Sequence, residues 1–284
     1  MKFEHVWTGN WKNAFRGLRH PMESYDKSDS KFGIAPVDWL GDIQQIVEQK
    51  YINSWEKYHG ELSVPDKHEI FEFLDENSGL DYDPMQECYD YAFIGPADMD
   101  LAQRMIRAGS PNDKFLRQIF VSVDITAPLY WWKEMDTYKV ATVANSTSTM
   151  HKLASTPITL DCFETDDYNS DIAYPEDPSM PTPLGIIQYC ERLRQIYLET
   201  KDIRYWKELI RWLPESWLQT RAWSANYAVL RQIIHWRKGH RLKYEWDSFI
   251  KWCQSLPYSQ ELLFYANGYE NEYKLHDLLS PKCD

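Results

Sequence analysis

Apolar and polar residues alternate strictly in one segment near the middle of the chain. Its aliphatic residues stand two apart, at Ile119, Val121, Val123 and Ile125, with Phe120, Ser122 and Asp124 between them. Because successive side chains of a strand point to opposite faces, this pattern predicts a strand over residues 119–125 with one buried face. A short helix is predicted after Pro128, in LYWWKEMDTYK, and a ligand-binding loop in the hydroxyl-rich segment ATVANSTSTMH that follows.

In the C-terminal half, apolar residues recur every three or four positions, as they do along one face of a helix. Thr182 followed by Pro183 predicts the start of a first helix, because a threonine N-cap and a first-turn proline favour initiation. Its apolar stripe is Ile186, Tyr189, Cys190, Leu193 and Ile196. Further helices are predicted over 202–213, 216–238 and 243–254. The second of these rests on residues at intervals of 4, 3, 4, 4 and 3, namely Leu218, Ala222, Ala225, Val229, Ile233 and Trp236.

The N-terminal half carries fewer regular patterns, because Gly and Pro interrupt it. Helices are predicted over residues 42–58 and from an N-cap at Asp98 to a stop at Gly109. Together the elements predict an α+β fold with helices packed on a sheet and a helical C-terminal half. We expect one domain over residues 1–284, a length that a single domain can reach.

An acidic, proline-rich loop insertion is predicted at about 161–183, after a strand near Ile158–Phe163. It belongs to a segment, residues 153–191, that contains eight Asp or Glu and no Lys, Arg or His. Carboxylates in this number could bind a metal ion, but runs of acids are usually just solvated. We therefore predict no metal site here.

Composition excludes several classes of protein. The formal net charge of -12 argues against a general nucleic-acid binder and against a protein that binds anionic membranes. No apolar run is long enough to cross a membrane, and the N-terminus lacks the apolar core of a signal peptide. The five Cys are scattered and no C-x-x-C occurs, which predicts free thiols in a cytoplasm. The 13 Trp and 19 Tyr serve either a Trp-rich core or stacking surfaces for heterocycles.

Charge is unevenly distributed along the chain. Residues 192–243 hold twelve Lys or Arg and four acids, a net charge of +8, so the rest of the chain carries -20. In an acidic protein, such a basic segment favours an anionic small ligand such as a phosphate ester. The alternative is that these charges form the polar faces of amphipathic helices.

The segment FVSVDITAPLYWWKEMD, followed by TYKVATVANSTST, resembles the flavin-dependent thymidylate synthase family. In that family a strand and an Ala-Pro-like turn lead into a helix that ends in the signature R-H-R-x-x-S-x-N-E-x-S-x-R. Counted from Pro128 without gaps, Thr137-Tyr138-Lys139 stand at R-H-R, Asn145 at the Glu, Thr147 at the second Ser and Thr149 at the last Arg. Only Lys139 keeps one of the three leading basic residues, and Lys does not replace Arg in a bidentate phosphate contact.

A second segment is closer to the same family, which has an Arg before Leu-Pro, an Asn on the next helix and an Arg eleven residues later. Here Arg211 precedes Leu213-Pro214, and Arg237 lies eleven residues beyond Asn226. Weaker matches are residues 16–24 and 105–119. The resemblance covers about residues 98–152 and 203–250, under half of the chain, and is to members from phages and bacteria.

The resemblance implies an antiparallel sheet with packed helices and a reaction at C5 of a pyrimidine deoxynucleotide. It implies FAD as cofactor, with methylene-tetrahydrofolate and NADPH as co-substrates, and a protein that supplies positioning and electrostatics. The substrate contacts implied are Arg237, Arg211, Glu134, Thr147 and Thr149. The cofactor contacts implied are Asn226, Gln232, Lys139, Tyr138 and Asn145. No catalytic residue is assigned.

Two functions stay open at this point. In the first, the chain is a thymidylate-synthase-like flavoenzyme of nucleotide metabolism, a cytoplasmic homotetramer in a bacterium or a phage-infected cell. In the second, it binds a nucleotide or a partner protein on the same fold without turnover. No other motif competes: the chain has no Walker loop, no G-x-G-x-x-G and no G-x-S-x-G, and His235 and His240 lie off the spacing of a helical zinc pair.

Overall fold

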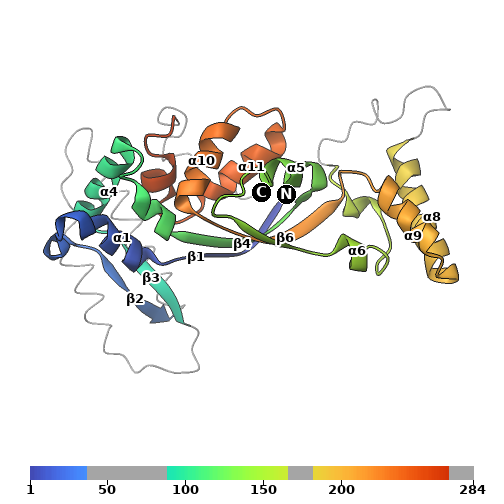
Figure 1. The fold of residues 1–284 in the computed structure, drawn as a ribbon, viewed down its shortest axis with the longest axis horizontal. Helices are drawn as coiled ribbons and strands as arrows, with labels where there is room; N and C mark the ends of the chain where they lie inside the picture. The colour runs from blue at the N-terminus through green and yellow to red at the C-terminus, as the bar shows by residue number, and fades with distance from the viewer. Residues whose placement is uncertain (37–87, 166–181, 269–284) are drawn as a thin grey trace, which may run out of the picture. The chain divides into compact units, whose positions relative to one another are not determined.

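The computed structural model describes residues 1–36, 88–165 and 182–268 (Figure 1). Its contacts divide the chain into two compact units, one of Met1–Thr8 with Ile119–Asp284 and one of Gly9–Gln118. A single domain over residues 1–284 stays a prediction. The helix predicted over 42–58 and the middle of the acidic loop insertion lie outside the described residues.

The first unit is built on a four-stranded sheet in the order β1-β4-β6-β5. The strands are β1 (Lys2–Gly9), β4 (Phe120–Pro128), β5 (Val143–Ser146) and β6 (Leu218–Asn226). β4 and β6 run antiparallel along their whole length, from the pair Phe120–Asn226 to the pair Pro128–Leu218. β5 is antiparallel to the other edge of β6. The α+β class with an antiparallel sheet and packed helices is therefore confirmed.

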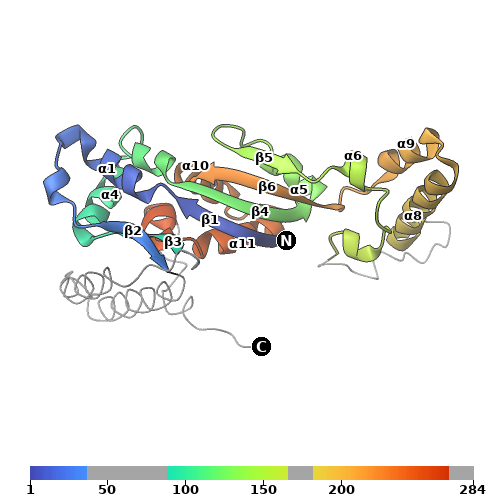
Figure 2. The same ribbon diagram turned by 90° about the horizontal axis from the view of Figure 1, so that it is seen from below.

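The alternating pattern of β4 places one apolar face in the core. Val121, Val123 and Ile125 are almost fully buried, whereas Ser122 and Asp124 stay partly exposed, as predicted. Helices α5 (Leu129–Met135), α10 (Tyr227–Arg237) and α11 (Lys243–Gln254) lie over one side of the sheet in Figure 1. Seen from below in Figure 2, the strands lie in front of these helices. The short helix predicted after Pro128 and the one over 243–254 are both present.

Tryptophans fill the layer between the sheet and these helices. The Trp131 ring lies 5.0 Å from Trp132, 5.1 Å from Trp246 and 5.9 Å from Phe249, measured between centroids. All four side chains are fully buried. Burying large aromatic rings is strongly favourable, so much of the unusual aromatic content stabilises this core.

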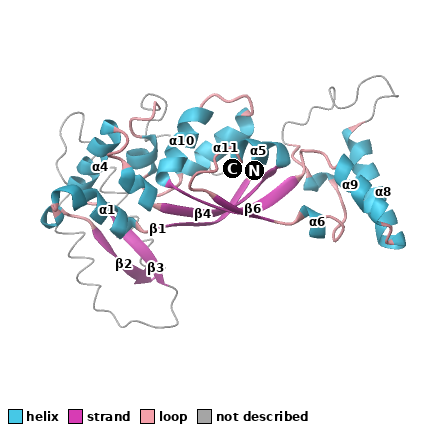
Figure 3. Cartoon of the chain, in the orientation of Figure 1, coloured by secondary structure: helices cyan, strands magenta, loops and turns pink. Residues whose placement is uncertain are grey.

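The helix predicted over 216–238 is wrong in its first half. Residues 218–226 form strand β6, and only from Tyr227 does the chain become helical, as α10 (Figure 3). Asn226 separates the two elements, because its side-chain Oδ1 accepts a hydrogen bond from the Val229 backbone N–H at 3.1 Å and caps the helix. Pairing with β4 and β5 satisfies the backbone of this segment, and that tertiary pairing overrides the helical spacing of its apolar residues.

Two further helices form a hairpin, α8 (Pro183–Thr200) and α9 (Ile203–Trp212). Their predicted starts are confirmed, since Thr182 and Asp202 both accept N-cap hydrogen bonds. Of the predicted stripe on α8, Cys190 and Leu193 are buried, but Ile186 and Tyr189 are exposed. The hairpin has its own small core, formed by Leu153, Ile158, Phe163, Ile187, Cys190, Leu193 and Leu209.

The segment between β5 and this hairpin differs from the predictions in two ways. The strand predicted near Ile158–Phe163 is a 3-10 turn at Leu160–Cys162, with a single β-bridge from Phe163 to Trp217. Side-chain packing against the hairpin, not a strand ladder, accounts for its apolar residues. The predicted hydroxyl-rich loop contains β5 and the short helix α6 (Thr149–Lys152), because β5 pairs with the edge of β6.

The second unit contains α1 (Trp11–Arg19), the hairpin of β2 (Lys31–Pro36) and β3 (Cys88–Phe93), and α4 (Pro96–Ala108). Short 3-10 turns of this unit occupy His20–Met22, Tyr25–Lys27 and Lys114–Gln118. The first unit also contains a π-helical turn, at Ser259–Phe264.

Asp98 is not the N-cap of the helix that the sequence predicted. α4 begins at Pro96, and the Asp29 carboxylate accepts hydrogen bonds from the Ala97 and Asp98 backbone N–H groups. The Asp98 side chain is fully buried, where it accepts hydrogen bonds from Arg19 and Ser28. The helix ends at Gly109 as predicted, with a φ of 67° that glycine adopts without strain.

No described helix combines the length and the apolar character that a membrane span needs. No three His, Cys, Asp or Glu side chains in this part of the chain are grouped as metal ligands. Cys162, Cys190 and Cys253 are free thiols.

Candidate functional site

Arg237, the last residue of α10, lies in a clamp of aromatic rings. Its Cζ is 4.7 Å from the Trp246 ring centroid and 5.1 Å from that of Tyr138. Its Nη1 is 3.2 Å from Oε2 of Glu134, near the end of α5, and its side chain is only 13% exposed. Three residues that the sequence predicted as site residues, Arg237, Glu134 and Tyr138, are thus brought together.

This clamp contains hydrogen-bond donors without acceptors. Arg237 Nε and Trp246 Nε1 are both buried, and neither has a hydrogen-bond partner in the described part of the chain. Leaving a buried donor unsatisfied costs about 1–3 kcal/mol, and more for a charged group. A ligand that carries carbonyl or phosphate oxygens would satisfy them.

Tyr138 stays neutral at physiological pH. Burial raises the pKa of its phenol, and the nearby positive charge of Arg237 opposes that rise only in part. The tyrosine therefore offers Arg237 an uncharged aromatic face, which is the arrangement of a cation–π contact.

A second polar group is formed around Asp136, two residues after Glu134. The Arg221 Nη1 donates to both Asp136 carboxylate oxygens, at 2.8 and 3.1 Å, and its Nε donates to Gln219 Oε1 at 2.9 Å. Gln219 Nε2 in turn donates to the Thr147 carbonyl oxygen at 3.1 Å and to Thr149 Oγ1 at 3.2 Å. Predicted site residues Thr147 and Thr149 are therefore joined to the end of α5 through Gln219 and Arg221. We call this chain of hydrogen bonds, from Asp136 through Arg221 and Gln219 to Thr147 and Thr149, the Arg221 relay.

The two groups meet at the C-terminal end of α5, because Glu134 contacts Arg237 and Asp136 contacts Arg221. Four residues of these groups were not among the predicted site residues: Trp246, Asp136, Arg221 and Gln219. The sequence contains a pattern that could have identified Arg221 and Gln219. They stand two apart, in line with Trp223 and Ala225, as residues on one face of a strand do. Reading that segment as a strand would have put Arg221 on the same face as the buried Trp223.

The remaining predicted residues are not drawn into this cluster. Lys139 and Gln232 are exposed, and Asn145 lies on the exposed strand β5, opposite Ala222 of β6. Asn226 is buried and caps α10, so it does not lie on one helix with Gln232. Arg211 is on α9, 59% exposed, and forms an ion pair with Glu208 at 2.9 Å.

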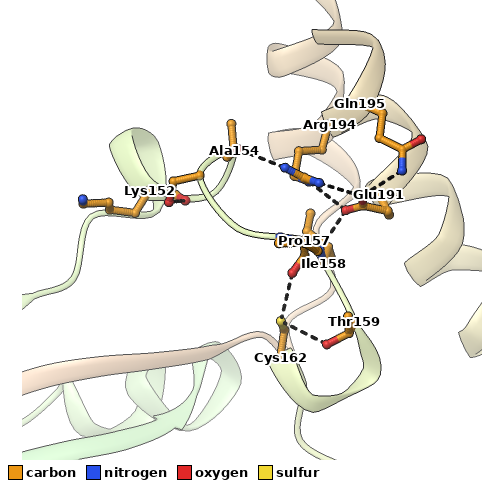
Figure 4. Close-up of polar contacts among 10 residues, drawn as sticks. Lys152, Ala154, Pro157, Ile158, Thr159, Cys162, Glu191, Arg194 and Gln195 are labelled. Carbon is orange, nitrogen blue, oxygen red and sulfur yellow. Dashed lines mark hydrogen bonds and ion pairs between the residues drawn. The ribbon is translucent and has the colours of Figure 1, made fainter. Parts of the chain in front are cut away.

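A separate polar cluster stabilises the base of the helix hairpin (Figure 4). Arg194 donates to both Glu191 carboxylate oxygens at 2.7 Å and to the Ala154 carbonyl oxygen at 3.1 Å. The Glu191 carboxylate also accepts from the Ile158 backbone N–H at 2.7 Å. These hydrogen bonds, that of Arg194 first, lower the pKa of Glu191 to about 2 despite its partial burial.

An open hollow of about 470 Å³ lies beside this cluster. It is lined by Ile158, Thr159, Leu160, Leu184, Ile187, Gln188, Glu191, Arg192 and Gln195. None of the predicted site residues lines it. No residue that lines it has a buried side-chain donor without a partner, whereas Arg237 has one beside two predicted site residues, so the end of α5 is the candidate functional site.

No protein-family model matches the chain, and no curated protein matches it. Solved structures do. Flavin-dependent thymidylate synthase ThyX from Helicobacter pylori, in complex with FAD and dUMP, has a TM-score of 0.53 at 14% sequence identity, over 94% of this chain and 99% of that one. A second structure of ThyX from that organism, with FAD and dUMP at 2.31 Å, has a TM-score of 0.47 at 15% identity, over 70% of this chain and 90% of its own.

At 14% identity the first likeness shows the fold alone. It agrees with the fold that the resemblance implied, an antiparallel sheet with packed helices. The activity, the ligands and the residue roles are a separate question, since one fold can serve many functions.

Proposed function

We propose that this chain is a thymidylate-synthase-like flavoenzyme that alkylates C5 of a pyrimidine deoxynucleotide. One observation carries the proposal. A largely buried arginine, clamped by Tyr138 and Trp246, keeps an unpartnered Nε on a fold similar to that of an enzyme solved with FAD and dUMP. A guanidinium with a free edge binds the oxygens of a phosphate or of a pyrimidine carbonyl.

In this proposal Arg237 holds the nucleotide, and Glu134 fixes the direction of its guanidinium. Thr147 and Thr149 contribute hydroxyl groups to the same ligand, and Arg211 contributes a further charge. Asn226, Gln232, Lys139, Tyr138 and Asn145 bind the flavin. The Oδ1 atom of Asn226 caps α10, so its amide nitrogen is the atom left to donate to a cofactor.

The residues fit a ligand of the FAD and nucleotide type, because the unpartnered atoms at the clamp are donors and both molecules are rich in acceptors. When bound, FAD would supply the redox chemistry, with methylene-tetrahydrofolate as one-carbon donor and NADPH as reductant. The side chains would bind, orient and exclude water around the reacting ring.

A homotetramer in the cytoplasm of a bacterium or a phage-infected cell is part of the proposal. Its support is twofold. Arg211 is exposed and bound only to Glu208 among the described residues, so it is available to another subunit. The hairpin also exposes large apolar side chains, including Tyr189, Ile203 and Trp212, as interfaces between subunits do.

A second candidate is a protein that binds the nucleotide without turnover. It is favoured by the lost signature charges: Thr137 and Tyr138 replace two basic residues, and Thr149 replaces the last arginine. Nucleotide binding is common to both candidates, and only catalysis separates them.

The test begins with the visible spectrum of the purified protein with and without added FAD. Calorimetric titration with dUMP follows, and then an assay for dTMP with all co-substrates. Arg237→Ala is expected to weaken dUMP binding roughly thirtyfold, about 2 kcal/mol. Arg237→Lys should weaken it nearly as much, because Lys lacks the two parallel N–H donors of a guanidinium.

The matched control is Arg104→Ala, which removes an exposed arginine paired with Asp100 on α4 and should leave dUMP binding unchanged. FAD and dUMP binding without dTMP formation would favour the second candidate. Absence of nucleotide binding in the wild type would refute both.

A further inference from the structure

Arg221 is oriented from three sides and still has one donor edge free. Its guanidinium lies over the Trp132 ring, with Cζ 4.3 Å from the centroid. Nη1 donates to Asp136 and Nε to Gln219, while Nη2 donates to no described residue. The side chain is 16% exposed. Such a guanidinium has lost its rotational freedom before any ligand arrives, so little entropy opposes a further contact.

Gln219 extends this orientation to the segment that follows β5. Its Oε1 accepts from Arg221, so its NH₂ group must face the other way, toward the Thr147 carbonyl and Thr149 Oγ1. Its backbone carbonyl also accepts from Trp132 Nε1 at 2.9 Å, which fixes the strand on the aromatic core. Without Arg221 the amide could flip, and its oxygen would then oppose the Thr147 carbonyl oxygen.

The Thr149 hydroxyl is left as a donor by this arrangement. Its oxygen accepts from Gln219, and the hydroxyl hydrogen makes no bond to a described residue. A hydroxyl both donates and accepts, so its hydrogen is available to a ligand oxygen. The Arg221 relay therefore has two donors without a partner among the described residues, Arg221 Nη2 and the Thr149 hydroxyl. The Gln219 Oε1 and Thr147 carbonyl oxygens already accept hydrogen bonds within the relay.

We propose that Arg221 and Thr149 form an anion site that binds the phosphate of the nucleotide, with Gln219 as the positioning residue between them. This inference rests on the proposed function and names a residue that neither the resemblance nor the sequence patterns assigned. Thr149 itself stands where the signature would have an arginine. Arg221, on the neighbouring strand β6, is joined to that position through the two hydrogen bonds of the Gln219 amide. Asp136 is half-exposed, so solvent screens its opposing charge.

The test separates the phosphate from the rest of the nucleotide. Wild type, Arg221→Lys and Thr149→Val are titrated with dUMP, with deoxyuridine, which lacks the phosphate, and with inorganic phosphate. Arg221→Lys keeps the charge near Asp136 but cannot donate to Gln219 and the phosphate together. It should bind dUMP about tenfold more weakly, the loss expected for a charged hydrogen bond. Deoxyuridine binding should change less than twofold.

Thr149→Val, at the first residue of α6, keeps the shape of the side chain and should weaken dUMP binding about threefold, since a single neutral hydrogen bond contributes less. It keeps the proposal testable if Arg221→Lys folds poorly, which thermal unfolding would reveal. Arg104→Lys on α4 is the control and should alter none of the three titrations.

An equal loss of dUMP and deoxyuridine binding in Arg221→Lys would overturn the phosphate site and make the relay purely structural. Unchanged dUMP binding in both variants would also overturn it. If wild type binds inorganic phosphate in an Arg221-dependent way but no nucleotide, the anion site stands and the proposed function fails. If it binds neither nucleotide nor phosphate, both fail.

Discussion

Arg194 and Arg237 each form an ion pair with a glutamate, yet their surroundings differ. Arg194 at the helix hairpin uses all three of its nitrogens, on both Glu191 oxygens and the Ala154 carbonyl. Among the described residues, Arg237 at the end of α10 pairs through Nη1 with Glu134 and contacts two rings, and its buried Nε has no partner. An arginine whose nitrogens are all hydrogen-bonded within the protein stabilises the fold. A buried arginine with an unbonded N–H destabilises it, and a ligand that accepts a hydrogen bond from that N–H gains the corresponding free energy on binding.

The largest effect on stability is expected at Arg194, whose nitrogens are all hydrogen-bonded. Arg194→Ala removes two hydrogen bonds and the counter-charge from the Glu191 carboxylate and the side-chain donor from the Ala154 carbonyl. It should lower the free energy of unfolding by about 2–3 kcal/mol. Urea denaturation followed by tryptophan fluorescence measures it. A loss below about 0.5 kcal/mol would mean that the hairpin cluster is no more than a surface ion pair.

The same comparison predicts the opposite outcome at Arg237. Arg237→Met keeps an unbranched side chain between Tyr138 and Trp246 and removes the unsatisfied Nε, so its cost in unfolding free energy should be under about 1 kcal/mol. Glu134 is 42% exposed and returns to solvent. Binding of dUMP should nevertheless weaken roughly thirtyfold, as in Arg237→Ala. A cost as large as that of Arg194→Ala would make Arg237 a structural residue.

A third prediction uses pH to sharpen the role of Glu191. Its folded pKa is about 2, below the ordinary value of 4.5, so its contribution to stability is complete above pH 4.5 and declines as pH falls toward 2. The difference in unfolding free energy between wild type and Glu191→Gln should therefore shrink over that range. A difference that does not change with pH would show that the charge of Glu191 is not what stabilises the hairpin.

Asn226 provides a smaller test, at the boundary between β6 and α10. Asn226→Ala removes the cap on the Val229 backbone N–H and should cost about 1 kcal/mol of unfolding free energy. Asn226→Asp keeps an acceptor there and should restore most of that stability. If FAD binding falls in both variants while stability recovers in the second, the amide nitrogen contacts the cofactor.

The smallest effect is expected at Tyr138. Tyr138→Phe keeps the ring that lies 5.1 Å from the Arg237 Cζ and removes only the hydroxyl. Because the cation–π contact belongs to the ring, dUMP binding should change less than about threefold. Tyr138→Leu should weaken binding more, and equal losses in the two variants would assign the effect to the hydroxyl.

Residues close together in the sequence account for the elements that were predicted correctly. The strand around Val121 and Val123 follows from strict alternation, and the start of the first hairpin helix follows from the N-cap at Thr182. Each of these signals acts within a few residues, through side-chain direction or a local hydrogen bond, so it is written in the sequence itself.

The candidate site was predicted only in part, for a related physical reason. Arg237 and Glu134 were found through a resemblance, but Arg221 was hidden in a segment that the spacing of Leu218, Ala222 and Ala225 assigned to a helix. Those apolar residues fit a helical period, and nothing local excludes it. The pairing partner that excludes it is β4, about a hundred residues earlier in the chain.

The sequence by itself thus determined the strand β4, the N-cap of α8, the charge of the basic segment and the resemblance that led to Arg237. Tertiary structure decided that residues 218–226 form a strand, and that this strand carries Arg221 to Asp136 and to Thr149. The reason is that a strand obtains its hydrogen bonds from another part of the chain. Its conformation, and the side-chain contacts that depend on it, exist only once that partner is in place.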